Sequence, residues 1–504
     1  MRSNIISREK EIKILEEFYT SNIPELLALY GRRRVGKTFL VRSFFERKKQ
    51  KKQKEIIFLD ITGMQNGFMA EQIRNFTDAL GTAFVHQGAR LEAGKNWYES
   101  FRILSEYIKL VPEDKKIVLF FDEFPWMVTK NSKLLQFLEY YWNHDWSKDN
   151  RIKLIICGSS AGWILKNIIN NTKGLYNRVT RTIQLEPFDL QETKKYLFHK
   201  GIRLNNRQVA ELYMVLGGIP HYLNQVTKGL SATQVIEQLA FVKKGFLLDE
   251  FEKLYATLLH DAKNCIEIIR LIAQHRYGIG QQELLEKISD VGGGSKIKLL
   301  DDLENAGLIM KFKSKWNRKR GIYYIVTDEY SLFYLYWIEP IKETLLVKGL
   351  RKGYWEKTQL NPSWHIWKGY AFEALCYKHL AKIGDVLSLS PTAIPGTWKY
   401  VPKRNKAKTK NAKNTDMQGT QIDLLFDRDD DVITICEIKY TKEPFIIDKQ
   451  YAHNLINKTG IFRRITKTTK QIFIAIISAN GLKPSIYSEE MISNVVTLDD
   501  FFKE

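Results

Sequence analysis

Short apolar runs alternate with longer amphipathic stretches through the first 190 residues. The runs lie at Glu25–Tyr30, Glu55–Ile61, Ile117–Phe121, Lys153–Cys157 and Thr182–Leu185. Short continuous runs of this kind are typical of strands that are buried on both faces, and the stretches between them are long enough for helices. The alternation therefore predicts a parallel sheet with helices on both faces.

Three further patterns follow along the chain. Residues 191–260 are mostly amphipathic and predict a helical lid. Residues 261–345 predict three helices and then two strands that are joined by a basic loop. Residues 346–504 are aromatic, then helical around Tyr370–Ala381 and finally β-rich, with a Lys-rich loop at Lys399–Gly419. We therefore expect an α/β multidomain chain whose four domains cover residues 1–190, 191–260, 261–345 and 346–504.

Composition narrows the class of protein. The chain has 504 residues, and 78 Lys and Arg against 57 Asp and Glu give a formal net charge of +21. A hydrophobic content of 44% excludes wholesale disorder, because such a chain can bury enough apolar surface to offset its ordering entropy. The positive charge favours a polyanionic partner, either nucleic acid or an anionic membrane surface.

The chain shows neither a secretory signal nor a membrane segment. Its apolar runs are far shorter than the roughly 20 residues of a membrane-spanning helix. The four cysteines, Cys157, Cys265, Cys376 and Cys436, lie far apart and have no zinc-binding spacing, as expected for buried thiols in a reducing compartment. We therefore expect a cytoplasmic protein without a membrane partner.

The strongest local motif is GRRRVGKT at Gly31–Thr38, which matches GxxxxGK[ST]. It lies between a predicted strand and the helical run Phe39–Phe45, as in a phosphate-binding loop, where backbone N–H groups at a helix N-terminus surround the anion. Lys37 can reach the β- and γ-phosphates of ATP, and the Thr38 hydroxyl can bind Mg²⁺. The residues expected to bind nucleotide here are Gly31, Arg34, Val35, Gly36, Lys37, Thr38 and Phe39.

The sequence KIVLFFDE, at Lys116–Glu123, predicts an apolar strand that ends in two carboxylates, Asp122 and Glu123. At that end of a parallel sheet, Asp122 is expected to hold Mg²⁺ and Glu123 to polarise the attacking water as a general base. Ser159 follows the next strand and is expected either to sense the γ-phosphate or orient the water through its hydroxyl, or to serve only as a turn residue. Arg178 is either an arginine finger, which would require a homo-oligomer if it acts in trans, or a surface arginine.

These motifs together resemble a known family. The segments Ser7-Arg8-Glu9, YGRRRVGKT, LFFDEFPWM, IICGSS, LYNR and LGGIPHYL look like those of the archaeal-type ATPases, which are AAA+-related STAND P-loop nucleotide hydrolases and more distantly similar to origin-recognition ATPases. The resemblance implies that Arg8 and Gly217–His221 lie near the nucleotide base or the lid. It also implies a winged helix, a C-terminal PD-(D/E)xK nuclease-like domain, and a role in defence or mobile-element biology.

Residues 261–327 have the pattern of a winged helix-turn-helix. Three helices, Cys265–Gln274, Gln281–Ile288 and Ser295–Asn305, precede two strands that flank the basic segment Lys311–Arg320. The third helix of such a module can enter the major groove of DNA while wing cations contact phosphates. A module that serves only for packing or autoinhibition has the same pattern, and the cationic wing favours DNA.

The C-terminal region contains a D…ExK pattern. Asp423 lies on one expected strand, and Glu437 and Lys439 lie on the next, where period-two alternation places both on one face. Asp423, Glu437 and Glu373, on the preceding helix, are candidate ligands for Mg²⁺ or Mn²⁺, and Lys439 is a candidate to activate water or stabilise the phosphate. A degenerate nuclease fold that only binds DNA or protein is the alternative.

The sequence thus supports two hypotheses. In the first, ATP and Mg²⁺ control DNA binding and metal-dependent DNA cleavage, so the chain is both an ATPase and a deoxyribonuclease, with a protein trigger that is not specified. In the second, the chain is a nucleotide-switched DNA- or protein-binding regulator whose nuclease-like domain is inactive.

Overall fold

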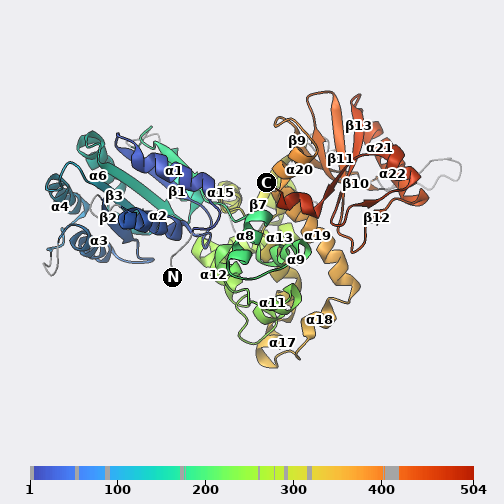
Figure 1. Cartoon of the computed structure of the whole chain (residues 1–504), viewed down its shortest axis with the longest axis horizontal. Coiled ribbons are helices and arrows are strands. Elements are labelled where there is room, and N and C mark those ends of the chain that lie inside the picture. Colours follow the sequence, from blue (N-terminus) through green and yellow to red (C-terminus); the bar gives the residue numbers. More distant parts are fainter. Residues whose placement is uncertain are drawn as a thin grey trace. The chain divides into compact units, whose positions relative to one another are not determined.

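The computed structural model describes residues 5–51, 56–85, 91–170, 175, 177–258, 261–276, 278–288, 293–314, 321–400, 402 and 419–503 (Figure 1). The chain divides into two compact units. The N-terminal unit comprises Met1–Pro187, Ile219–His221 and Thr257–His260, and the C-terminal unit comprises Phe188–Gly218, Tyr222–Ala256 and Asp261–Glu504. The last three expected domains therefore fall almost entirely in the C-terminal unit.

The N-terminal unit is built on a five-stranded parallel sheet of order β2-β3-β4-β1-β5, which confirms the predicted parallel sheet. Its strands are β1 (Glu25–Tyr30), β2 (Ile56–Thr62), β3 (Lys116–Asp122), β4 (Ile152–Gly158) and β5 (Arg181–Gln184). Because the pairs are parallel, the carboxyl ends of β1, β3 and β4 lie at one edge of the sheet. The phosphate-binding motif follows β1 there, Asp122 is the last residue of β3, and Ser159 follows β4.

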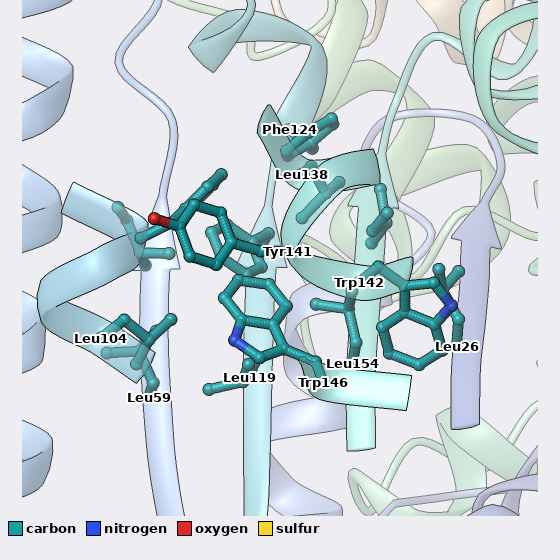
Figure 2. Close-up of a cluster of buried hydrophobic side chains, with 14 of the residues drawn as sticks. Leu26, Leu59, Leu104, Leu119, Phe124, Leu138, Tyr141, Trp142, Trp146 and Leu154 are labelled. Atoms are coloured by element: carbon teal, nitrogen blue, oxygen red, sulfur yellow. The ribbon is translucent and has the colours of Figure 1, made fainter. Parts of the chain in front are cut away.

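Helices cover both faces of this sheet. They are α1 (Glu9–Thr20), α2 (Lys37–Lys51), α3 (Met69–Phe84), α4 (Trp97–Lys109), α5 (Phe124–Met127), α6 (Leu134–His144) and α7 (Ala161–Ile164), with short turns η1 (Trp146–Lys148) and η2 (Leu165–Ile169). One face packs against α3, α4 and α6, and Figure 2 shows Trp146 and Tyr141 lying over strand residues such as Leu119. On the other face, Phe45 of α2 stacks on Phe58 of β2.

Helices continue the chain after β5. They are α8 (Leu190–His199), α9 (Asn206–Leu216), α10 (Pro220–Leu223), α11 (Ala232–Ala240) and α12 (Glu250–Leu258). Helix α9 starts after Asn205, whose side chain accepts a hydrogen bond from the Gln208 N–H, and it ends at Gly217, which has a positive φ of 60°. Apart from the Ile219–His221 and Thr257–His260 segments, these helices belong to the C-terminal unit.

Three helices and a small antiparallel sheet come next. The helices are α13 (Ala262–Ala273), α14 (Gln281–Lys287) and α15 (Gly293–Asn305), and the sheet has the order β6-β8-β7, with β6 (Ile279–Gly280), β7 (Ile309–Ser314) and β8 (Gly321–Val326). Residues 315–320 of the expected wing lie outside the described residues. Within its described part, Lys311 pairs with Glu304 at 2.6 Å.

The last part contains a mixed five-stranded sheet of order β15-β13-β11-β10-β9. Its strands are β9 (Ile394–Tyr400), β10 (Thr420–Asp427), β11 (Val432–Lys439), β13 (Gln471–Ser478) and β15 (Ile492–Thr497), and β12 (Phe445–Ile446) and β14 (Leu482–Lys483) form a separate pair. The accompanying helices are α16 (Glu329–Phe333), η3 (Tyr334–Ile338), η4 (Glu339–Ile341), α17 (Lys342–Val347), α18 (Tyr354–Thr358), α19 (Pro362–Lys378), α20 (Leu380–Val386), α21 (Lys449–Thr466), α22 (Ile486–Met491) and η5 (Leu498–Phe502).

Three details differ from or add to the sequence expectations. The helix expected around Tyr370–Ala381 is interrupted at His379, which ends α19 and precedes α20. Strands β9 and β15 were not anticipated. The Lys-rich loop at Lys399–Gly419 lies largely outside the described residues.

All four cysteines are buried, as expected. Across the described stretches, none of the helices combines the length and the apolar character needed to span a bilayer.

Candidate functional site

The phosphate-binding motif forms a tight loop between β1 and α2. Gly31 has a φ of 146°, and a Cβ at this position would lie 2.2 Å from the carbonyl oxygen of Leu185, so a side chain would collide with backbone. Gly36 also has a positive φ, of 97°, immediately before α2 begins at Lys37. The Leu40 N–H donates to the Gly36 carbonyl at 2.8 Å and closes the first helical turn. The N-terminus of α2 is thus formed in the manner that anion binding requires.

Lys37 is buried at the centre of this loop. Its ammonium group donates to the carbonyl oxygens of Gly31 at 2.8 Å and Arg32 at 3.0 Å, and to Ser159 Oγ at 3.2 Å. Ser159 is itself buried. The loop lysine is therefore held at the carboxyl edge of the sheet, next to the end of β4.

Thr38 and Asp122, the two residues expected to hold Mg²⁺, are in contact. Thr38 Oγ1 donates to Asp122 Oδ2 at 2.7 Å, although the two residues are 84 positions apart. The Asp122 side chain is buried and also accepts the Glu123 N–H at 3.1 Å. A hydroxyl and a carboxylate in contact at the phosphate loop are oxygen donors of the type Mg²⁺ binds, so these two residues fit the ion.

Glu123 contacts the end of the adjacent strand. Its backbone is left-handed, with φ 45° and ψ 44°, a conformation that few residues other than glycine adopt. Its carboxylate accepts the Ser159 N–H at 3.1 Å and is in close hydrogen bond with the Ser159 hydroxyl. Ser159 therefore contacts both Lys37 and Glu123. A residue that served only to form a turn would not need these two side-chain contacts.

The remaining residues that the sequence predicts for the nucleotide site differ in burial and position. Val35 is buried, Phe39 is 49% exposed, and Arg34 has a positive φ of 73°. Arg178 is exposed in the turn before β5. Arg8 is buried, and its guanidinium donates to the Glu186 carbonyl at 2.7 Å. The His221 N–H donates to the Arg34 carbonyl at 3.4 Å, which places the end of the LGGIPH motif beside the phosphate loop.

The parallel sheet, the glycine loop at the start of α2 and the Thr38–Asp122 contact define this unit as a P-loop nucleotide-binding domain. Residues 5–226 match the family model described as an ATPase domain predominantly from Archaea.

Two curated relatives come from Methanocaldococcus jannaschii. An uncharacterized protein is 24% identical over 386 residues, which cover 76% of this chain and 79% of that protein. An uncharacterized ATP-binding protein is 47% identical over 47 residues, which are 9% of this chain and 80% of that protein.

Solved structures with lower similarity were also found. The Walker-type ATPase PABY2304 of Pyrococcus abyssi has 21% identity and a TM-score of 0.47, with 66% of this chain and 97% of that chain covered. The Aeropyrum pernix ORC2 protein, in its ADPNP–ADP complexes, has 14% identity and a TM-score of 0.44, with 68% and 96% covered.

A second set of polar residues gathers on the C-terminal sheet. We call Asp423 of β10, Glu437 and Lys439 of β11, and Tyr451 and Lys458 of α21 the C-terminal cluster. Four of them, all except Tyr451, line a cavity of about 840 Å³. The structure thus brings Asp423, Glu437 and Lys439 together as their strand pattern predicts.

Glu437 is the most heavily bonded member of the C-terminal cluster. Its buried carboxylate accepts the Tyr451 hydroxyl at 2.9 Å, lies 3.5 Å from Lys439 Nζ and forms a short ion pair with Lys458. Burial alone would raise its pKa, but Lys458 and Lys439 hold the pKa of Glu437 below its usual value. Burial and the neighbouring Glu437 raise the pKa of Asp423.

Glu373 of α19 lines the same cavity but pairs with a residue from another element. Arg276, between α13 and β6, donates to the Glu373 carboxylate through both Nε, at 3.3 Å, and Nη2. Burial and the nearby Asp423 raise the pKa of Glu373 to about 7, and Arg276 opposes this shift.

The oxygen donors of this region are the kind that Mg²⁺ or Mn²⁺ prefers, but cations of the chain engage two of the three carboxylates. In the part of the chain that the structure describes, no group of three His, Cys, Asp or Glu side chains is arranged to hold a metal ion. Any ion would therefore have to compete with Arg276 for Glu373 and with Lys458 for Glu437.

Sequence reasoning missed three residues here: Lys458, Tyr451 and Arg276. Tyr451 and Lys458 are seven residues apart on α21, a spacing of two helical turns that places both on the face toward Glu437. That spacing after the ExK strand was a usable signal. No local pattern connects Arg276 to Glu373, which lies 97 positions away.

Proposed function

We propose that this ATPase controls DNA binding and Mg²⁺-dependent DNA cleavage by its C-terminal region, in defence or mobile-element biology. The observation that carries the proposal is the convergence of Asp423, Glu437 and Lys439 on one cavity. Basic side chains from several elements line that cavity, which suits a phosphodiester. We further propose that the C-terminal sheet is a PD-(D/E)xK nuclease-like domain.

The residues of the C-terminal cluster would divide the work. Asp423 and Glu437 would hold Mg²⁺, which when bound supplies a Lewis acid for the phosphoryl oxygen. Lys439, partly exposed to the cavity, would stabilise negative charge on the phosphate or orient the attacking water. Tyr451 and Lys458 would fix the position of the Glu437 carboxylate.

Helices α13–α15 and the β6-β8-β7 sheet would serve as a winged helix that binds the DNA. The order of three helices followed by the β7–β8 hairpin supports this assignment, as does the basic composition of the segment between the two strands. Phosphate contacts from that segment would add affinity without sequence preference.

Helix α9 offers a route by which nucleotide can influence the C-terminal cluster. Its Glu211 accepts the hydroxyl of Tyr440 at 3.5 Å, and Tyr440 directly follows Lys439. Glu211 also pairs with Lys368 of α19 at 3.6 Å. The C-terminal end of α9 leads through Gly217 and Gly218 into the segment that ends at His221, beside the phosphate loop.

A plasmid assay tests the proposal. Purified protein with ATP and Mg²⁺ or Mn²⁺ should nick supercoiled DNA, and both Asp423→Asn and Lys439→Ala should abolish nicking while ATP turnover continues. Asp430→Asn, on the exposed turn between β10 and β11, is the matched control and should nick normally. Wild-type nicking by the Asp423→Asn protein would exclude the C-terminal cluster as the cleavage site.

One observation favours a second candidate, a nucleotide-switched regulator that binds DNA or protein without cutting. The pairing of Glu437 with two lysines and of Glu373 with Arg276 gives a site already neutralised by the chain's own cations. This candidate predicts ATP-dependent DNA or protein binding with no nicking under either metal.

A further inference from the structure

Arg276 extends into the cavity of the C-terminal cluster from a different part of the chain. It lies just after α13, in the segment that leads to β6, whereas the other lining residues named above come from α19, α21 and the C-terminal sheet. Its guanidinium carbon lies 3.4 Å from the ring centroid of Tyr370, and its nitrogens contact both oxygens of Glu373. Stacking and bidentate pairing together fix the plane of the guanidinium.

The two partners of this ion pair differ in their surroundings. The Glu373 side chain is 7% exposed, whereas that of Arg276 is 31% exposed. Arg276, Tyr370 and Glu373 also line a second cavity, of about 480 Å³, on the side of α13 and η3. Arg276 therefore lines two cavities and is the more exposed partner of the ion pair.

The charges around the larger cavity favour an anionic ligand. Its lining includes three carboxylates (Glu373, Asp423 and Glu437) and four basic side chains (Arg276, Lys399, Lys439 and Lys458). Lys458 and Lys439 both interact with Glu437, which is buried beneath them. Arg276 is the basic group whose carboxylate partner lies on a helix outside the sheet, and a guanidinium binds a phosphate with the same two-pronged geometry as a carboxylate.

We propose that Arg276 is a phosphodiester-binding residue of the C-terminal cavity, and that Glu373 holds its guanidinium until a nucleic-acid phosphate replaces that carboxylate. This inference rests on the proposed function, because it takes the C-terminal cavity as a DNA site. It adds that the segment between α13 and β6, part of the proposed DNA-binding module, contributes directly to that site.

A binding measurement in EDTA separates this role from cleavage. Fluorescence anisotropy with a short labelled DNA duplex should show that Arg276→Gln binds about tenfold more weakly than wild type, with a salt slope lower by about one. Arg276→Lys should lie between the two, because it keeps the charge but loses the bidentate geometry. Arg270→Gln is the matched control: Arg270 is an arginine of α13 that pairs with Glu339 at 2.6 Å, and it does not line the larger cavity.

Glu373→Gln completes the test. Glutamine has no negative charge at position 373, so this variant should release Arg276 and bind DNA about threefold to tenfold more tightly than wild type. The gain in DNA affinity should vanish in the Arg276→Gln, Glu373→Gln double variant. Near-ultraviolet circular dichroism of each variant shows whether its fold is retained. Unchanged affinity and salt slope for a folded Arg276→Gln protein would overturn the assignment, as would a gain from Glu373→Gln that persists without Arg276.

The outcomes also distinguish this inference from the proposed function. If the binding effects appear but no metal supports nicking, Arg276 keeps its role and the cleavage proposal fails. If the wild type nicks DNA and Arg276→Gln binds and nicks equally well, only the Arg276 assignment fails. Faster nicking by Arg276→Gln at unchanged DNA affinity would make the arginine a blocking group and overturn its assignment to phosphate. Absence of DNA binding by the wild type overturns both.

Discussion

The carboxylate of Glu123, at the end of β3, accepts hydrogen bonds from both the backbone N–H and the hydroxyl of Ser159, at the end of β4. The same hydroxyl accepts a hydrogen bond from Lys37 at 3.2 Å. The lysine of the phosphate loop and the candidate general base are thus joined through one serine. Because Lys37 is the residue that contacts nucleotide phosphates in this class of protein, the link can report phosphate binding to Glu123.

Substitution of Ser159 by alanine should slow ATP hydrolysis. The change removes the hydroxyl that orients Glu123 but leaves the backbone N–H contact, so we expect kcat to fall about tenfold, equivalent to one hydrogen bond, with little change in KM. Steady-state phosphate release measures both constants. Ser160→Ala, one residue further along, is the control and should retain wild-type turnover; an equal loss in both variants would point to a general disturbance of the loop.

Substitution of Thr38 by valine should change the Mg²⁺ requirement of the ATPase. Valine keeps the shape of the side chain but cannot bond to Asp122 or bind the ion, so turnover should need at least about tenfold more Mg²⁺. Titration of phosphate release with MgCl₂ gives the requirement, and fluorescent-nucleotide binding in EDTA should be the same as for wild type. A Mg²⁺ curve identical to that of the Thr20→Val control would exclude Thr38 as an ion ligand.

Continuous apolar strands were well predicted from sequence, whereas the two edge strands of the C-terminal sheet were not. The bounds of β1 agree with the predicted run Glu25–Tyr30, because strands buried on both faces need an unbroken apolar pattern. The missed strands β9 and β15 are the two edges of the C-terminal sheet. Strand β9 contains Pro395 and Gly396, which normally argue against a strand and are tolerated at an edge.

The candidate sites show the same division between local and distant information. The phosphate loop and the ExK strand are contiguous motifs, so their spacing alone predicted where Lys37, Glu437 and Lys439 would point. Arg276 contacts Glu373 from 97 positions away, and no spacing encodes that contact. At His379, where α19 ends, the buried imidazole contacts the carbonyl of Leu375 four residues earlier, while the helical pattern of the sequence continues.

Lys153 should make stability depend on alkaline pH. Its buried side chain on β4 bonds to Ser21 Oγ at 2.6 Å and to the Ile23 carbonyl, and burial, reinforced by Lys116, lowers its pKa to about 8. The pKa of a lysine in the unfolded chain is roughly 10.4. At pH values between these two pKa values, the unfolded chain binds more protons at Lys153 than the folded chain does. The free energy of unfolding should therefore rise with pH in this range, by at most about 1.4 kcal/mol per pH unit.

Urea denaturation of wild type and Lys153→Met at a series of pH values measures this contribution as the difference between the two proteins. The difference should shift in favour of wild type as the pH rises from about 8 towards 10. Lys148→Met, at an exposed position of the same unit, should show no such shift. A pH-independent difference for Lys153→Met would mean that this lysine remains charged in the folded protein.

Trp146 should be a major contributor to the stability of the N-terminal unit. Its ring packs edge-on against Phe101 with centroids 5.4 Å apart, and its indole N–H donates to Ser105 Oγ at 2.9 Å (Figure 2 shows its place in the core). Trp146→Ala should lower the free energy of unfolding by about 3–5 kcal/mol. Tyr140→Ala, 45% exposed on α6, should cost less than about 1 kcal/mol in the same denaturation experiment, and similar losses would contradict the assignment of the core.

Arg178 allows a test of whether the ATPase site is shared between two copies of the chain. It is exposed in the turn before β5, a position from which its guanidinium could enter a neighbouring copy's nucleotide site as an arginine finger. Arg178→Ala should then lower turnover by about 10³-fold without weakening nucleotide binding, and Lys37→Ala should abolish turnover. Because each variant keeps the residue that the other lacks, an equal mixture of the two should release phosphate well above the sum of the separate proteins.

Arg102→Ala is the control for this experiment. Arg102 is 60% exposed on α4, and its variant should be fully active alone. A mixture that stays inactive would place the finger in the same chain as its site, and a fully active Arg178→Ala protein would show that Arg178 is a surface arginine.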